Sequence, residues 1–77
     1  MPSYRRIPHV VEAVQWHPGD VVEGVIVPVP GDGDPHVLTL RGPIRVEPGD
    51  WIVTGSNGDR YPVPSDVFVE SYVRERP

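Results

Sequence analysis

Few side chains in this chain of 77 residues are of types that carry catalytic or metal chemistry. It has no cysteine, and none of its serines lies in the Gly-x-Ser-x-Gly turn that presents a nucleophile. Its histidines, His9, His17 and His36, lack the short helical spacing with which two histidines bind one metal ion. The residue types therefore predict a protein that is not an enzyme and that holds neither a cofactor nor a metal.

Aromatic and arginine side chains are the residues best suited to binding. Trp and Tyr are enriched at the energetic centres of protein interfaces, which makes Trp51 and Tyr61 candidate contact residues. Arginine forms paired hydrogen bonds with phosphate. Arg41, Arg45 or Arg60 beside one of these rings would therefore suit a nucleotide-like ligand.

The charge balance bears on the class of partner. The formal net charge is −4, and arginine supplies all 7 of the basic residues. Because affinity for nucleic acid comes mainly from basic side chains that neutralise phosphates, this balance disfavours a nucleic-acid partner. No apolar run is long enough to span a membrane, and none follows the N-terminus as it would in a signal peptide, so we expect an intracellular protein without a membrane partner.

Short β-strands are the elements expected to position these side chains. The chain has 11 prolines and 8 glycines, and its 38% of hydrophobic residues are mostly valine and isoleucine. β-Branched residues favour strands, and proline and glycine favour tight turns, so the composition excludes a helical bundle. The length corresponds to one small domain over residues 1–77.

Alternation and turn residues predict about six short strands joined by tight turns. The Asn57-Gly58 pair predicts a hairpin, and Pro62 confines the returning strand to an edge or a bulge. Residues 64–66 suit a single helical turn, whereas residues 20–29 fit a short helix and a strand equally well. The expected strands cover residues 7–16, 36–40, 44–47, 51–54, 60–63 and 67–73.

Strand periodicity also predicts which side chains are buried. In the first strand it puts Val10, Val14 and Trp16 on one apolar face. Residues 51–54 are apolar on both faces, which is typical of a central strand. We expect both tryptophans to lie in the core, and the alternative is that they form a flat binding patch.

Together these features predict a mostly β fold, a small antiparallel curled sheet or barrel of about five to six short strands. Connections this short pair neighbouring strands antiparallel, because parallel pairs need crossovers of about a dozen residues or more. One short helix is expected across an open end, and a helix over residues 20–29 would make the fold α+β instead.

Two blocks of the sequence resemble a family of small, mostly uncharacterised phage and prophage proteins. Residues 4–16 (YRRIPHVVEAVQW) are similar to the family's opening, Tyr-Arg-Lys-Lys-Pro and then Val-Val-Glu-Ala-x-Gln-Trp. Residues 49–53 (GDWIV), 61–62 (YP) and 66–68 (DVF) are similar to its C-terminal pattern, although Val63 stands where the family often has cysteine. The resemblance implies a phage or prophage origin and a cytoplasmic location in a bacterial host, and it assigns no catalytic residue.

The function expected from these observations is that of a non-enzymatic accessory protein which acts by contact with a host or phage protein. One alternative is a small oligomer that binds and sequesters a nucleotide-like ligand between its subunits. Another is a structural component of a virion. Self-association is expected on physical grounds, because a small sheet has exposed edges that a second copy can cover.

Overall fold

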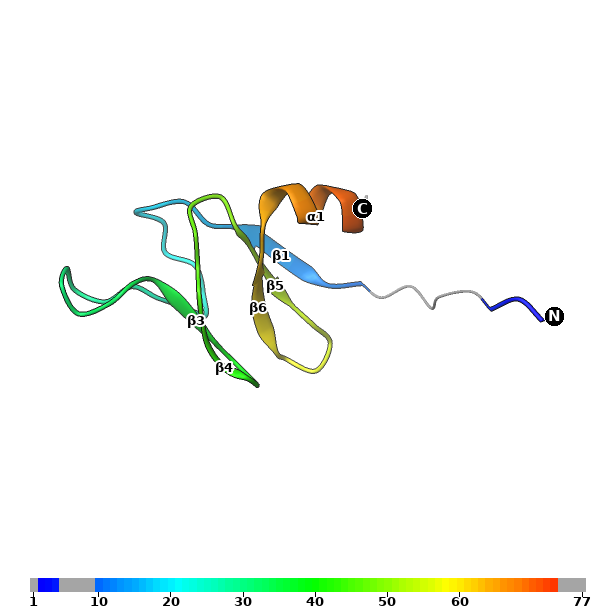
Figure 1. Cartoon of the computed structure of the whole chain (residues 1–77), viewed down its shortest axis with the longest axis horizontal. Coiled ribbons are helices and arrows are strands. Elements are labelled where there is room, and N and C mark those ends of the chain that lie inside the picture. The colour runs from blue at the N-terminus through cyan, green and yellow to red at the C-terminus, as the bar shows by residue number, and fades with distance from the viewer. Residues whose placement is uncertain (1, 5–9, 74–77) are drawn as a thin grey trace.

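The computed structural model of the protein describes residues 2–4 and 10–73. Within this part of the chain the fold is mostly β, with six short strands and one short helix (Figure 1). In chain order the elements are β1 (Glu12–Gln15), β2 (Val25–Ile26), β3 (His36–Thr39), β4 (Gly42–Arg45), β5 (Trp51–Thr54), β6 (Arg60–Val63) and α1 (Ser65–Ser71).

The strands form two antiparallel sheets of three strands each. Sheet A has the order β1-β5-β6 and sheet B the order β2-β3-β4. The predicted fold class is therefore confirmed, and the strands do not close into a barrel. Each strand is too short to belong to both sheets, and the chain crosses from β4 to β5 through a turn at Pro48, whose ring nitrogen has no hydrogen to donate to a ladder.

The hydrophobic core lies between the two sheets. Ile52 on β5 and Trp16, which directly follows β1, pack with Val37 on β3 and Val46, which directly follows β4. None of these side chains is more than 3% exposed. β5 is the central strand of sheet A, as the apolar pattern of residues 51–54 predicts. The sheets are thus joined by packing across this core.

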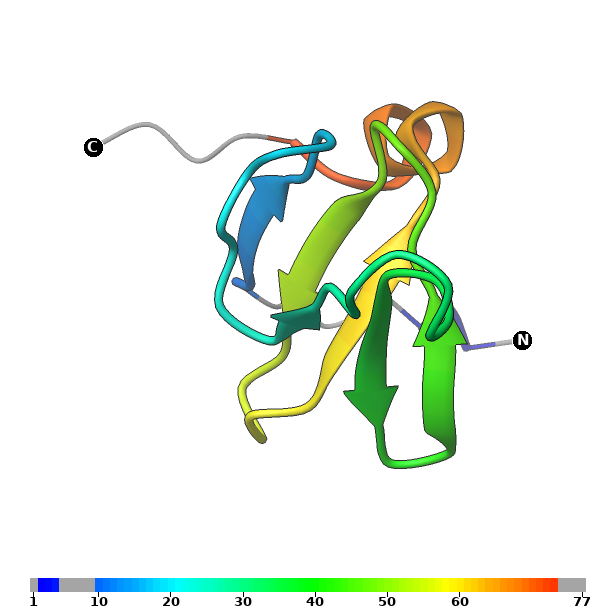
Figure 2. The same ribbon diagram turned by 90° about the vertical axis from the view of Figure 1, so that its left-hand side faces the viewer.

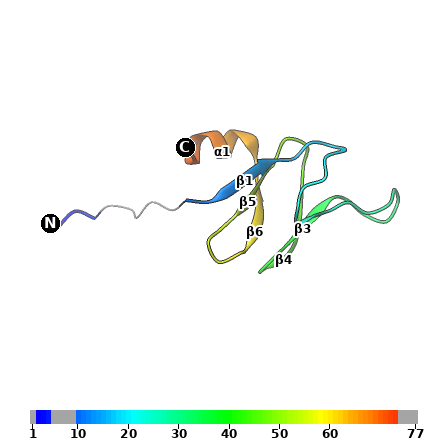
Figure 3. The ribbon, with the colours of Figure 1, turned by 180° about the vertical axis from the view of Figure 1, so that it is seen from behind.

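Sheet A is covered on its second face by the helix. Alternation puts Trp51 and Val53 on the face of β5 opposite Ile52. Their register partners on β6 are Val63 and Tyr61. α1 packs on this face against the Trp51 ring. Figures 2 and 3 show sheet A with α1 on one side and the β3–β4 hairpin on another.

The prediction of a strand over residues 67–73 is wrong, because most of this segment belongs to α1. The Phe68 N–H donates to the Pro64 carbonyl at 2.8 Å, and the Tyr72 N–H donates to the Phe68 carbonyl at 3.0 Å. Positions four apart lie on one side of a strand and also on one side of a helix, so the spacing of these two aromatic residues did not distinguish the two structures. The helical turn expected at residues 64–66 coincides with the start of α1 at Ser65.

Residues 20–29, which fitted a helix and a strand equally well, form turns and the short strand β2. Gly24 has a φ of +92°, a conformation that a continuing right-handed helix does not allow. A Cβ at this position would also meet the Arg60 side chain. The segment is therefore held in a turn by a tertiary contact as well as by its β-branched residues.

The apolar face predicted for the first strand is buried only at one end. Trp16 is 3% exposed, but Val14 is 53% exposed and Val10 is 75% exposed. The reason is that β1 is an outer strand of sheet A, and sheet B covers its C-terminal end alone. Two valines are therefore left at the surface beside an unpaired strand edge.

Candidate functional site

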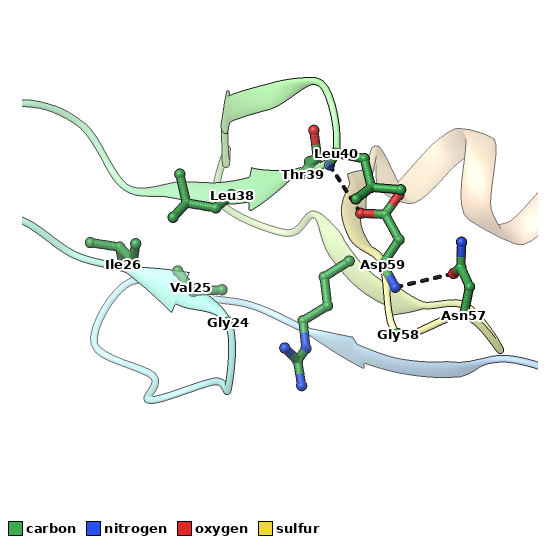
Figure 4. Close-up of a pocket in the computed structure, with 10 residues that line it drawn as sticks. Gly24, Val25, Ile26, Leu38, Thr39, Leu40, Asn57, Gly58 and Asp59 are labelled. Carbon is green, nitrogen blue, oxygen red and sulfur yellow. Dashed lines mark hydrogen bonds between the residues drawn. The ribbon is translucent and has the colours of Figure 1, made fainter.

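A groove of about 480 Å³ lies where β3 runs past the end of β2. β2 pairs with β3 only at Val37 and His36, so among the described strands none forms a ladder with β3 on this side from Leu38 onward. The opposite wall is the β5–β6 hairpin, residues 57–60 (Figure 4). The groove is therefore a gap between an incomplete sheet B and the hairpin of sheet A.

Exposed aliphatic side chains line the groove on the sheet B side. Leu40 is 81% exposed, Leu38 is 61% exposed and Ile26 is 43% exposed. Figure 4 shows Leu38 and Ile26 next to each other, with Leu40 just past the end of β3, near Asp59. We call the surface formed by these three residues and residues 57–60 the leucine groove.

Polar groups fix the opposite wall of the leucine groove. The Leu40 N–H donates to Asp59 Oδ1 at 3.2 Å, which ties the end of β3 to the hairpin. The Asp59 N–H donates in turn to Asn57 Oδ1 at 3.1 Å. These bonds connect the end of β3 to the hairpin, so the two walls meet at this end of the groove.

Arg60 closes one end of the leucine groove. Its guanidinium Nη2 lies 3.1 Å from Glu23 Oε1, and its side chain is 32% exposed whereas that of Glu23 is 87% exposed. The stem of the arginine lies against Gly24, where no Cβ would fit. The charged side chains that line the groove are those of Asp59 and Arg60, and Arg60 is paired with Glu23, which does not line it.

The candidate binding residues taken from the sequence are not brought together. Trp51 and Tyr61 lie on the face of sheet A that α1 covers, and Arg60 lies on the opposite face because its register partner is Thr54. Arg45 lies on sheet B. Its Nε is 3.2 Å from a Glu47 carboxylate oxygen and 3.9 Å from one of Asp34.

Arg41 completes the set of predicted arginines. It is exposed in the turn between β3 and β4, where its backbone N–H donates to Thr39 Oγ1 at 3.0 Å. Within the described residues, therefore, no predicted arginine shares a face with the two predicted aromatic residues.

The predicted aromatic residues belong instead to a stack that holds the helix. The Trp51 and Phe68 ring centroids are 4.2 Å apart with planes inclined by 5°, and those of Phe68 and Tyr72 are 4.8 Å apart with planes inclined by 20°. We call these three residues the aromatic stack. Trp51 is half-buried, so of the two tryptophans only Trp16 lies in the core.

Tyr61 lies next to the aromatic stack. Its hydroxyl is 3.4 Å from that of Tyr72. This hydrogen bond, together with burial of the ring, raises the pKa of Tyr61 from 10.0 to about 12. A tyrosine with so high a pKa stays neutral at ordinary pH, so it acts here as a hydrogen-bonding group.

Sequence reasoning missed the aliphatic side chains of the leucine groove. Residues 36–40 were correctly predicted as a strand, and alternation puts Leu38 and Leu40 on the same face. The pattern does not show which face is turned outward, because that depends on where sheet A packs. The short length of β2, which opens the groove, left no signal in the sequence.

Two further properties concern the described residues alone. Residues 2–4 and 10–73 contain no group of three or more His, Asp or Glu side chains that could hold a metal ion. His9 lies outside the described residues. The same part of the chain contains no helix that is long and apolar enough to cross a membrane.

Residues 42–77 match the model of a protein family described as PGDYG protein. The matched segment is just under half of the chain and includes Pro48-Gly49-Asp50, the three letters with which that description begins. No curated protein and no solved structure matches the chain. The match supports a relationship to a family of small uncharacterised proteins, and a phage or prophage origin stays a prediction.

Proposed function

We propose that this chain is a non-enzymatic interaction protein that binds an apolar segment of a protein partner in the leucine groove. The observation that carries the proposal is the exposure of Ile26, Leu38 and Leu40 along the groove. Contiguous exposed apolar side chains on a small soluble domain are typical of an interaction surface. The volume of the groove falls in the range of about 300–1,000 Å³ that is usual for binding pockets.

The charge beside the groove favours a partner segment with basic flanking residues. Arg60 is paired with Glu23, which leaves the Asp59 carboxylate in the lining, and the whole chain has a net charge of −4. Complementary charge of this kind speeds encounter and selects among apolar segments. The resemblance to small phage and prophage proteins supports a host or phage protein as the partner and the bacterial cytoplasm as the setting.

Selection from a displayed library of random peptides tests this proposal. We expect the folded protein to enrich peptides that combine large aliphatic residues with lysine or arginine. Replacing Leu38→Ser and Leu40→Ser together should weaken binding of a selected peptide at least about tenfold, the effect of roughly 1.4 kcal/mol.

The control variant carries Val67→Ser and Val69→Ser, two exposed valines on α1, and should bind the peptide like the unaltered protein. Circular dichroism checks that both variants are folded. Failure to enrich any peptide, or equal binding by the two variants, would show that the leucine groove is not the binding surface.

A further inference from the structure

The open edge of β1 differs from the other strand edges in the described part of the chain. β6, the other edge of sheet A, packs against β3 and contains Pro62. β4 contains Pro43, and β2 is only two residues long. Proline, a very short strand and coverage by another strand are usual protections against edge-to-edge pairing, and within the described residues β1 has neither the proline nor the coverage, although it carries one charged residue, Glu12.

The backbone groups that β1 presents at this edge follow from its pairing with β5. The Trp16 N–H donates to the Asp50 carbonyl at 2.8 Å, and the Trp16 carbonyl accepts from the Gly49 N–H at 2.8 Å. Backbone groups of an antiparallel strand point alternately to its two sides, so Val14 also faces β5. The N–H and carbonyl groups of Ala13 therefore point away from the sheet.

We infer that β1 pairs with β1 of a second copy of this chain, antiparallel, about a two-fold axis that passes through Ala13. This register joins Ala13 to Ala13 of the second copy, and Val11 to Gln15 of the second copy and the reverse. Every outward-facing residue of the segment 11–15 then has a backbone partner. The result is one continuous sheet made of two copies of sheet A.

Side-chain chemistry favours this register over its neighbours. The two-fold axis keeps each face of the sheet on its own side, so paired residues must lie on the same face of their strands. The axis must therefore pass through one residue of β1 and its counterpart in the second copy. An axis through Glu12 would put two carboxylates opposite each other, which is destabilising. An axis through Val14 would pair Ala13 with Gln15 of the second copy. The outward backbone groups of Val11 would then have no partner within the segment 11–15. The axis through Ala13 puts Glu12 opposite Val14 of the second copy, where the exposed valine packs on the aliphatic part of the glutamate.

The other strands of sheet A lie on one side of β1. β5 and β6 separate β1 from the β3–β4 hairpin, as Figure 2 shows. α1 packs at Trp51, on β5, and so lies inward from the free edge. The leucine groove lies on the far side of β5 and stays open in the pair, which makes the inference independent of the proposed function.

Sedimentation equilibrium over a range of protein concentrations tests the inference. We expect a reversible dimer, and the change Ala13→Pro should raise its dissociation constant at least tenfold because it removes an outward N–H that β5 does not use. Val14→Glu should weaken the dimer similarly by facing Glu12 of the second copy. The double change Glu12→Lys with Val14→Glu should restore it, since the new charges are opposite.

The variant with Leu38→Ser and Leu40→Ser is the matched control and should dimerise normally. A protein that stays monomeric at every concentration overturns the inference. So does a dimer that Val14→Glu leaves intact, or one that the control variant abolishes, since the latter would place the contact in the leucine groove.

Cross-linking provides a second measurement of the register that does not depend on affinity. The chain has no cysteine, so Ala13→Cys adds one thiol per copy. Opposed hydrogen-bonded residues have Cα atoms about 5.5 Å apart, within the range of a disulfide. We expect oxidation to link this variant into a covalent dimer. The variant Ser56→Cys, on the exposed hairpin, should not be cross-linked. Equal cross-linking of the two variants would contradict the proposed register.

Discussion

Three Pro-Gly-Asp tripeptides, at residues 18–20, 30–32 and 48–50, form the same type of turn. In each, the glycine has a φ between 89° and 94°, and the aspartate N–H donates to the carbonyl of the residue before the proline at 2.9–3.0 Å. These are the features of a type II turn, in which proline fixes the first central position and glycine allows the second. The three tripeptides therefore share one turn chemistry.

Two of these turns also anchor the buried Trp16. Its backbone pairs with residues 49–50, and its indole Nε1 donates to the Asp20 carbonyl at 3.3 Å. Asp50 is 8% exposed, and its Oδ2 accepts the Glu47 N–H at 2.9 Å. Asp32, in the third turn, is exposed.

The change Asp50→Ala should therefore lower the free energy of unfolding by about 1–3 kcal/mol, because the Glu47 N–H loses its charged acceptor. Urea denaturation followed by circular dichroism measures the loss. Asp32→Ala is the control, with an expected change within about 0.5 kcal/mol, as for exposed positions in general. Equal losses in the two variants would mean that the hydrogen bond from the Glu47 N–H to Asp50 contributes nothing to the free energy of unfolding.

The pH dependence of Tyr61 is a second expectation at this scale. The native pKa of about 12 lies above the ordinary 10.0, so the unfolded chain loses this proton first as the pH rises. The contribution of Tyr61 to the free energy of unfolding is complete below pH 10 and is lost as the pH rises toward 12. Denaturation in urea at increasing pH measures this loss.

Tyr72→Phe removes the hydroxyl that raises the pKa of Tyr61 most. In this variant the tyrosinate absorbance of Tyr61 should appear closer to pH 10. Tyr4→Phe should leave the high-pH transition unchanged, because Tyr4 is 91% exposed. A Tyr61 titration that Tyr72→Phe does not move would contradict the assigned cause.

At the scale of elements, α1 depends on the aromatic stack for its stability. The helix has seven residues, none of them buried, and Pro64 at its start provides no side-chain cap. Helices of this length are unstable alone in water, so packing on sheet A must hold it in place. Phe68 supplies that packing by contacting Trp51 in the sheet and Tyr72 at the end of the helix.

Replacing Phe68→Ala should cost roughly 2 kcal/mol of unfolding free energy and reduce the helical signal in circular dichroism, since ring stacking and apolar burial are lost together. The fluorescence of Trp51 should shift toward that of an exposed indole. Val69→Ala on the exposed side of α1 is the matched control and should change neither measurement appreciably. A helix that survives Phe68→Ala would show that another contact holds it.

At the scale of the whole molecule, the two sheets depend on one shared core. No strand passes between them, and Trp16 and Ile52 meet Val37 and Val46 across the interface. Within the described residues, sheet B packs only on the core that it shares with sheet A. Sheet A has one further packed face, the one under α1. We therefore expect the sheets to unfold together.

Single-tryptophan variants report on the two sides of sheet A separately. Trp51→Phe leaves Trp16 as a probe of the core between the sheets, and Trp16→Phe leaves Trp51 as a probe of the helix side. In each variant the urea midpoint from fluorescence should equal that from circular dichroism, because a two-state transition gives the same midpoint with every probe. Separate midpoints within one variant would indicate sheets that unfold independently.

Much of the local structure could be predicted because it depends on residues close together in the chain. The Asn57-Gly58 pair predicted the hairpin that is observed, in which the Gly55 N–H donates to the Asp59 carbonyl at 2.9 Å. Pro62 correctly predicted an edge position for β6. The central position of β5 followed from its apolar residues on both faces.

Predictions that depended on distant residues were less successful. The residues 67–73 became mostly helix because the Phe68 ring stacks on Trp51, a contact that the spacing of aromatic residues does not reveal. The exposure of Val14 and Leu38 depends on how far each sheet covers the other. The leucine groove was missed for the same reason.

The amino-acid sequence by itself determined the turns, the strand-rich composition and the antiparallel pairing, because proline, glycine and β-branched residues restrict the backbone locally. Only the tertiary structure decided that the strands divide into two sheets, that Trp16 is buried while Trp51 supports a helix, and that Arg60 and Tyr61 lie on opposite faces. The physical reason is that strand alternation assigns side chains to two faces, whereas the packing of other elements decides which face is covered.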